Sequence, residues 1–315
     1  MRNVMKRAQN KNVTYGVLFD EFEKRCKVKN VSDYTLKFYF NSLKPFEAFL
    51  DECNIETIRQ ISKDVYDEYI LYLREKYDNT VTINTYLRAV KTLLRYAMEC
   101  KYIDEFDIKV IKADEYIKET YSDDDIKKLI KKPDLKTCSF TEYRNWVLVQ
   151  YLLETGNRVS TFIRIKVRDV DLINGLVLIN TPKNHKQMYS PISKTMINVL
   201  KMYLDAFDFE DDDWLFPNNE RRQLTRGLAA KSIARYNKQR GVQITSLHSF
   251  RHTFAKNYVM NGGSAFKLQR LLGHSTLKVT QMYVNLFGTD LREDFDKYSL
   301  IEKYCSSQRI KRKIV

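Results

Sequence analysis

Apolar residues recur at helical spacing through the first hundred residues, with short polar joints between the runs. This repeat places apolar side chains on one face of each helix, which then packs against a core. The pattern predicts four amphipathic helices, at residues 15–26, 32–52, 62–76 and 82–100. Pro45 interrupts the backbone hydrogen bonds of the second helix and predicts a kink there. The apolar face of the fourth consists of Ile83, Leu87, Val90, Leu94 and Ala97.

The pattern changes after residue 107. A polar, charge-rich stretch at 108–121 predicts a linker, and Ser122-Asp123-Asp124-Asp125 predicts the capped start of a new helix. Residues 175–180 predict a β-strand, 181–186 a turn, and the residues through Tyr189 to Ile192 a second strand. A further helix is expected at 290–304, before a basic tail. The expected fold is mainly α with a small β component (α+β), in segments 1–107, 108–121, 122–300 and 301–315.

Composition narrows the function classes. The 315 residues suffice for two domains, and the net charge of +14 predicts attraction to a polyanion, although a basic solvated face would give the same value. The sequence has no run of about 18 apolar residues, as a membrane span would need, and no apolar segment after the basic N-terminal residues, as a signal peptide would need. We therefore expect a cytoplasmic protein. The five scattered cysteines predict neither a disulfide framework nor a zinc site.

An ordered set of chemical groups lies between residues 158 and 283. Arg158 and Arg251 can neutralise phosphate oxygens, because guanidinium is planar, charged and bidentate. Tyr283 offers a phenol, whose pKa of roughly 10 suits both a nucleophile and a leaving group. Alone, each is uninformative among 21 Tyr and 54 Lys and Arg, but three of the four histidines also fall within 248–274. The joint order favours a site that breaks and rejoins a phosphodiester.

His248 and His252 have the spacing of metal ligands on a helix. The Glu of a metalloprotease is missing between them, and Arg251 would repel a cation. We therefore expect chemistry with no metal and no cofactor.

Four motifs carry a family resemblance: Thr155-Gly156-Asn157-Arg158-Val159-Ser160, His248-Ser249-Phe250-Arg251-His252-Thr253-Phe254-Ala255, Leu271-Leu272-Gly273-His274-Ser275 and Thr280-Gln281-Met282-Tyr283. Together they resemble the catalytic signature of the tyrosine recombinases, the phage-integrase and Xer-like family. The resemblance implies a helical, SAM-like core-binding domain at 1–107 and a catalytic domain at 122–300.

The resemblance also implies the residue roles. Tyr283 would attack the phosphate, giving a 3′-phosphotyrosyl link and a free 5′-hydroxyl. Arg158, Arg251 and His274 would hold the transition-state oxygens, and His248 would assist proton transfer. The family uses a lysine at a β-hairpin tip as general acid, which fits Lys183, with Lys186 in reserve.

Two positions depart from the family pattern. Thr161 stands where the family usually has a carboxylate, three residues after the first arginine, and Asn157 replaces a more common apolar residue. Asp169 is a candidate to orient Arg158 instead, or the arginine clamp is looser.

The sequence thus predicts a site-specific DNA recombinase acting on double-stranded DNA sites as a homotetramer. Its task would be integration or excision of a mobile element, or Xer-type resolution. The segment after Tyr283 would dock on a neighbouring protomer or on its own domain. A type IB topoisomerase, a telomere resolvase and a catalytically decayed DNA-binding regulator are the alternatives.

Basic helix faces are usually solvated surface, but in this context we expect DNA contacts from Lys37, Asn41, Lys44, Asn84, Arg88, Lys91 and Arg95.

Overall fold

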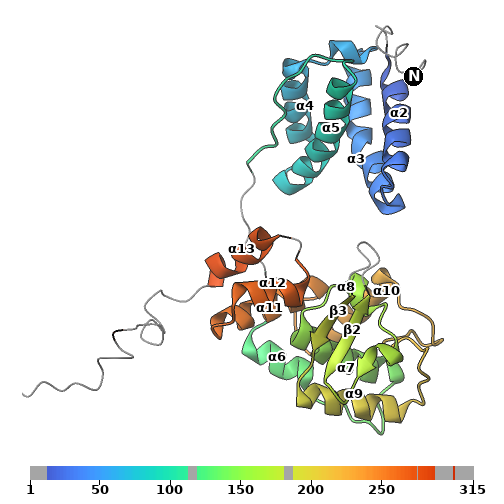
Figure 1. Ribbon diagram of the computed structural model, residues 1–315, viewed down its shortest axis with the longest axis vertical. Helices are drawn as coiled ribbons and strands as arrows, with labels where there is room; N and C mark the ends of the chain where they lie inside the picture. The colour runs from blue at the N-terminus through green and yellow to red at the C-terminus, as the bar shows by residue number, and fades with distance from the viewer. Residues whose placement is uncertain (1–12, 113–118, 181–186, 275, 288–300, 302–315) are drawn as a thin grey trace, which may run out of the picture. The chain divides into compact units, whose positions relative to one another are not determined.

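The computed structural model describes residues 13–112, 119–180, 187–274, 276–287 and 301. The chain divides into two compact units, Met1–Tyr116 and Ile117–Val315. Both are built mainly from helices, with one small sheet in the second (Figure 1). The expected fold class, mainly α with a small β component, is confirmed. No helix in the described ranges has the length and apolar character needed to cross a membrane.

The first unit contains the four helices that the apolar spacing predicts. Their bounds are α2 (Tyr15–Val28), α3 (Asp33–Glu52), α4 (Lys63–Lys76) and α5 (Thr80–Glu99), with a 3-10 turn, η1 (Ile58–Gln60), before α4. Thr14, Ser32, Ser62 and Asn79 cap them through side-chain oxygens that accept main-chain N–H bonds. The five residues of the predicted apolar face of α5 are all buried, which confirms that face.

The predicted linker is anchored to both units. Ile108 is buried in the core of the first unit, and the Tyr66 hydroxyl donates to the Lys109 carbonyl at 2.9 Å. At the other end Tyr121 is buried in the second unit, where its main-chain N–H donates to Thr253 Oγ1 at 2.9 Å. Although the segment 108–121 is rich in charged residues, its apolar residues Ile108 and Tyr121 are buried and attach its two ends to the two units.

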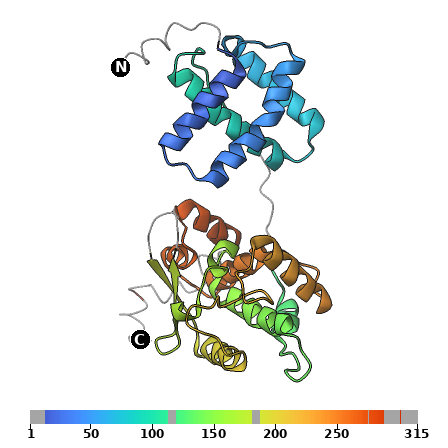
Figure 2. The ribbon, with the colours of Figure 1, turned by 90° about the vertical axis from the view of Figure 1, so that its right-hand side faces the viewer.

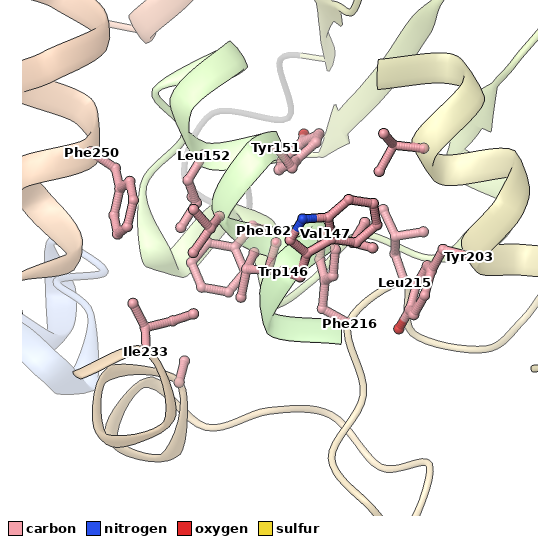
Figure 3. Packing of buried hydrophobic residues seen from close by; sticks show 14 of the residues in the cluster. Trp146, Val147, Tyr151, Leu152, Phe162, Tyr203, Leu215, Phe216, Ile233 and Phe250 are labelled. Atoms are coloured by element: carbon pink, nitrogen blue, oxygen red, sulfur yellow. The ribbon is translucent and has the colours of Figure 1, made fainter. Parts of the chain in front are cut away.

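The second unit surrounds one fully enclosed helix. Its helices are α6 (Asp123–Ile130), α7 (Phe140–Thr155), α8 (Val159–Phe162), α9 (Lys194–Ala206), α10 (Arg226–Gln239), α11 (Leu247–Met260), α12 (Ala265–Leu272) and α13 (Leu277–Phe287). Consecutive residues of α7 from Tyr143 to Val149 are buried, so this helix is enclosed on all sides. Figure 3 shows Trp146, Val147 and Leu152 of α7 between Phe250 of α11 and Tyr203 of α9. The expected capped start of α6 is confirmed, because Ser122 and Asp125 form a reciprocal capping box.

A three-stranded antiparallel sheet lies to one side of these helices (Figure 2). Its order is β1 (Val170–Asp171), β2 (Leu176–Asn180), β3 (Gln187–Pro191), and a 3-10 turn, η2 (Val167–Asp169), precedes it. Leu178 pairs with Tyr189 in the register of β2 and β3, which confirms the predicted strands. The hairpin tip at 181–186, with Lys183 and Lys186, lies outside the described residues. The basic tail and the helix expected at 290–304 also lie outside them, except for residue 301. The pairing of β1 with β2 was not anticipated.

Candidate active site

A small separate core joins α11, α12 and α13. Its buried members are Ala255, Val259, Leu268, Leu272 and Tyr283. Because α11 also packs on α7, this cluster fixes α13 to the body of the second unit. Tyr283 is thus held in the same part of the fold as Arg251 and the Leu272 turn.

Arg251 is buried and held by main-chain carbonyls. Its Nη1 donates to the Gly156 carbonyl at 3.0 Å, and its Nη2 donates to the Leu272 carbonyl at 2.8 Å. Burial, and then the positive charge of Arg158, lower the pKa of Arg251 to about 10, while Tyr283 acts in the opposite direction. Arg251 is therefore still protonated at neutral pH.

Arg158 approaches the same turn from the start of α8. Its Nη1 donates to the carbonyls of Leu272 at 3.2 Å and Gly273 at 3.3 Å. Both guanidinium groups consequently share the Leu272 carbonyl as an acceptor. Two arginines from elements far apart in the sequence converge on one main-chain oxygen.

The carboxylate buttress expected for Arg158 is replaced by backbone. Asp169, the proposed substitute, caps η2 instead, where its Oδ2 accepts the Lys166 N–H at 2.9 Å. That expectation was wrong, because the Asp169 carboxylate serves its own turn. Among the described residues, no ion pair involves Arg158 or Arg251, and carbonyl oxygens orient both side chains.

Two left-handed glycines shape the turns that present these carbonyls. Gly156 and Gly273, with φ of +61° and +60°, end α7 and α12. A Cβ on Gly156 would lie 2.7 Å from Phe254 Cδ1 and 2.9 Å from Leu272 Cδ2. Steric crowding therefore adds to the backbone requirement at position 156.

Asn157 has a local structural role. It is buried, and its Nδ2 donates to the Tyr151 hydroxyl at 2.8 Å. This bond provides a hydrogen-bond partner for the hydroxyl of Tyr151, a residue of α7 that is buried in the core of the second unit. The polar residue at this position is therefore compatible with burial, although the family pattern there is apolar.

His274 is buried directly after the Leu272–Gly273 turn. Its main-chain N–H donates to the Gln269 carbonyl at 3.0 Å, and its Nδ1 lies 2.8 Å from Thr280 Oγ1. Burial, and then the charges of Arg251 and Arg158, lower the pKa of His274 to about 4. His274 is therefore a neutral hydrogen-bonding group at physiological pH, not a cation.

Tyr283 is only 3% exposed. Its ring lies parallel to that of His274, with 6.4 Å between centroids and 2° between planes. Its hydroxyl lies 2.7 Å from Nδ1 of His252. Burial raises the pKa of Tyr283, and Arg251 and Arg158 act against that rise. The phenol thus lies in a buried site under the influence of two positive charges.

Family models match both units of the chain. The phage integrase family matches residues 119–289, more than half of the chain, and the N-terminal SAM-like domain of phage integrases matches residues 19–101. The chain belongs to the phage integrase family. It is a tyrosine recombinase, as the motif resemblance predicted.

Individual relatives agree with this family. The chain is 26% identical over 291 residues to tyrosine recombinase XerD of Staphylococcus haemolyticus, covering 89% of this chain and 98% of that protein. It is 25% identical over 279 residues to XerD of Staphylococcus epidermidis (strain ATCC 12228), covering 86% and 94%.

Solved structures show the same fold. XerH bound to its palindromic difH substrate has a TM-score of 0.68 at 19% identity, covering 89% of this chain and 84% of that one. A lambda integrase dimer bound to a COC' core site has a TM-score of 0.68 at 17% identity, covering 91% and 82%.

The structure of this recombinase shows contacts of three polar residues to which the sequence had assigned no catalytic role. His252 bonds the Tyr283 hydroxyl, Thr280 bonds the His274 ring, and Gln269 Nε2 donates to the His274 carbonyl at 3.3 Å. His252 stood out only for its spacing from His248. Its partner Tyr283 is 31 residues away, so the helical pattern carried no sign of the contact.

His248, the remaining histidine of the motif set, lies exposed in the first turn of α11, three residues before Arg251. Of the six residues expected to act in catalysis, Arg158, Arg251, His274 and Tyr283 are brought together by the contacts above. His248 shares the helix of Arg251.

The residues expected to contact DNA in the first unit fall into two groups. Exposed side chains are those of Lys37, Asn41, Lys44, Arg88 and Arg95. Asn84 is not among them: it is buried, its Nδ2 donates to the Ile111 carbonyl at 2.8 Å, and its Oδ1 accepts the Ile111 N–H at 3.1 Å. The expectation of an exposed Asn84 was wrong, because the segment after α5 covers that position. Lys91 is half-buried and donates to the Ile108 carbonyl.

Proposed function

We propose that this recombinase cleaves and rejoins DNA strands at specific sites through a covalent 3′-phosphotyrosyl intermediate formed by Tyr283. The observation that carries the proposal is the convergence of Arg158, Arg251, His274 and Tyr283 around the Leu272–Gly273 turn. These residues come from four separate segments. Two guanidinium groups close to each other repel, and a bound phosphate between them would offset that repulsion.

Charge stabilisation is the proposed role of the two arginines. A guanidinium has five N–H donors, and the carbonyl bonds aim these groups while other donors can face a phosphate. Charge on the non-bridging oxygens grows as Tyr283 attacks, so fixed positive groups favour the transition state over the ground state. His274, neutral and held by Thr280, supplies a further hydrogen bond without adding charge.

Proton transfer to the departing 5′ oxygen is assigned to Lys183. His248 is proposed to assist proton transfer in the same site. This assignment rests on the family pattern and on the position of Lys183 at the predicted tip between β2 and β3. Replacing the 5′-bridging oxygen by sulfur removes the need for that proton. Such a substrate should rescue Lys183→Ala more than Arg158→Ala; rescue of Lys186→Ala instead would move the role to Lys186.

Double-stranded DNA is the proposed partner, and a tetramer on two sites is the proposed assembly. The basic net charge, the exposed Arg88 and Arg95 and the family support DNA binding. A lambda integrase tetramer bound to a Holliday junction shares this fold, with a TM-score of 0.66 at 16% identity. We propose major-groove docking of the first unit through α3 and α5 without Asn84. The genomic task would be movement of a mobile element or Xer-type resolution.

A nicked suicide substrate tests the proposal. Cleavage next to the nick releases a short strand end and traps the enzyme covalently, which a denaturing gel detects. We expect trapping in the presence of EDTA, because charged side chains stabilise the transition state. Strand exchange between two sites would separate a recombinase from a topoisomerase. Specific DNA binding without trapping on any site would instead support the decayed-regulator alternative.

A further inference from the structure

Thr280 contacts the ring of His274 from inside the fold. Its side chain is fully buried on α13, and its Oγ1 lies 2.8 Å from Nδ1 of His274. Because Nδ1 is occupied by this contact, Nε2 is the ring nitrogen left for a phosphate. Under the proposed function, His274 stabilises the transition state by a hydrogen bond from that nitrogen.

The ring can form this bond in only one of its neutral forms. A neutral imidazole carries one proton, on either of its two nitrogens; that nitrogen donates a hydrogen bond, and the other accepts one. Phosphate oxygens accept hydrogen bonds, so Nε2 of His274 must carry the proton. With the proton on Nδ1, the lone pair of Nε2 would face the phosphate oxygen and repel it.

The neutral state of His274 makes this choice matter. Burial and the charges of the two arginines lower its pKa to about 4, so at neutral pH the ring cannot donate from both nitrogens at once. The main chain of His274 is already held by Gln269, which accepts its N–H at 3.0 Å and donates to its carbonyl at 3.3 Å. What remains to be fixed is the orientation of the ring and the position of its proton.

The burial of the Thr280 hydroxyl fixes the direction of its hydrogen bond. A buried hydroxyl that lacks an acceptor for its hydrogen is destabilising. Among the described residues, the acceptor at hydrogen-bond distance from Thr280 Oγ1 is His274 Nδ1. If Nδ1 carried the proton, it would donate to Oγ1 and leave the Thr280 hydrogen without that acceptor. Donation from Thr280 satisfies both groups and leaves the ring proton on Nε2.

Other buried threonines of this unit form a different bond. Thr155 and Thr253 each donate to the carbonyl four residues earlier in their own helices, at 2.7 Å and 2.8 Å. This is the usual local bond of a threonine inside a helix. Thr280 is the fourth residue of α13, and its hydroxyl meets the ring of a residue that lies before the helix. Its hydroxyl is therefore directed to the site and not to its own helix.

We propose that Thr280 is a positioning residue that selects the Nε2-protonated form of His274 and directs this N–H to a non-bridging oxygen of the scissile phosphate. Thr280 acts on the reaction through His274, because its own hydroxyl is buried. The bonds made and broken are those of the proposed transesterification. The inference rests on that proposed function and assigns a further residue to its site.

Thr280→Val and Thr280→Ser form a matched pair. Valine keeps the shape of threonine without the hydroxyl, and serine keeps the hydroxyl without the methyl group. We expect Thr280→Val to bind DNA normally and to trap a nicked substrate about 10- to 100-fold more slowly in a single turnover, the range seen when a hydrogen-bond partner behind a metal-bound histidine is removed. Thr280→Ser should recover most of the wild-type rate. An equal loss in both variants, or no loss in Thr280→Val, would overturn the proposal.

Nitrogen-15 NMR of the His274 ring gives a readout that does not depend on cleavage. The signals of this ring are those that disappear in His274→Gln, and the chemical shifts show which nitrogen carries the proton. At neutral pH we expect a protonated Nε2 and a bare Nδ1 in the wild type and in Thr280→Ser, and a mixture of the two forms in Thr280→Val. A protonated Nδ1 in the wild type, or an unchanged ring in Thr280→Val, would contradict the selection of the tautomer.

A double-mutant cycle shows whether Thr280 acts through His274. In the His274→Gln background, Thr280→Val should cause little further loss of trapping, because the ring that it positions is absent. Independent, multiplicative losses would mean that Thr280 acts by another route. If the wild type forms no adduct, the proposed transesterification fails. If it forms the adduct and Thr280→Val matches it, only the role of Thr280 fails.

Discussion

At the scale of single residues, the site is organised by main-chain oxygens. The Leu272 carbonyl accepts bonds from both Arg158 and Arg251, and Gly156 and Gly273 supply the two neighbouring acceptors. A carbonyl orients a guanidinium but leaves its charge in place, whereas a carboxylate would partly neutralise that charge. The clamp keeps its positive charge for an incoming phosphate, so Thr161 in place of the usual acid is compatible with catalysis.

Tyr283→Phe tests the nucleophile. The variant removes only the hydroxyl and its bond to His252, while the ring keeps its buried position beside His274. We expect normal DNA binding and no covalent adduct on a denaturing gel with nicked DNA. Stability should change by no more than about 1 kcal/mol, the typical worth of one hydrogen bond. An adduct in this variant would place the nucleophile elsewhere, with Tyr258 and Tyr298 the next to test.

The buried His274 predicts a pH effect on stability. Its pKa is about 4 in the folded protein and 6.5 in the absence of burial. As pH falls from 6.5 towards 4, the unfolded chain binds a proton that the folded chain does not, so stability is lost in that window and is fully present above it. Chemical denaturation at pH 7 and pH 4.5 should show a smaller loss in His274→Gln. An equal loss in both proteins would contradict the neutral, buried state of His274.

At the scale of elements, α5 combines three environments along one helix. Its apolar face lies in the core, Arg88 and Arg95 are exposed, and Asn84 holds the chain that follows. Asn84 and Arg88 are four residues apart, so both lie on one side of the helix. The segment at 108–111 covers the Asn84 end of that side and leaves the arginines open.

Asn84→Ala and Arg88→Ala form a matched pair. Removing the Asn84 amide leaves the N–H and carbonyl of Ile111 without these partners, so we expect a loss of about 1–3 kcal/mol in the free energy of unfolding. Removing the exposed Arg88 should cost at most about 0.5 kcal/mol. Urea denaturation of the two variants measures both. Equal stability in both would contradict the anchoring role of Asn84.

Arg88 and Arg95 carry the prediction on DNA contact. If each meets a phosphate, the double Ala variant should lower the slope of log affinity against log salt by about 1.8, at roughly 0.9 per phosphate. A fluorescence-anisotropy titration at several salt concentrations measures this slope. An unchanged slope and affinity would assign this face to solvent.

At the scale of the whole molecule, two units and a strong positive charge suit a protein that grips a long polyanion. Each unit has its own core, and the described ends of the joining segment pack on their own sides at Ile108 and Tyr121. Neither unit therefore depends on the other for its apolar core.

The net charge of +14 predicts strongly salt-dependent association. A footprint with about eight phosphate contacts gives a log-log slope near −7, because each contact releases condensed counterions. Affinity measured between low and moderate salt checks this value. A slope near −2 would mean that most of the positive charge lies away from the DNA.

The sequence by itself determined the four N-terminal helices, the start of α6, the hairpin strands and the family. Periodicity, caps such as Ser62 and Ser122, and the paired strands around 181–186 are local signals, so they are legible without contacts. The motifs around Arg158, Arg251, His274 and Tyr283 are equally local. The N-terminal helices accordingly begin and end within about two residues of their expected bounds.

Only the tertiary structure decided which polar group meets which. The contacts between His252 and Tyr283, between Asn84 and Ile111, and between the two arginines and Leu272 join residues 21 to 114 positions apart. No helical or strand period encodes such pairs. The contacts in the second unit depend on how α11, α12 and α13 pack around a shared core, and the Asn84 contact depends on how the segment after α5 folds back on that helix. Asn84 shows the same limit, since its place on a polar face is a property of the helix, while its burial is a property of the chain that folds over it.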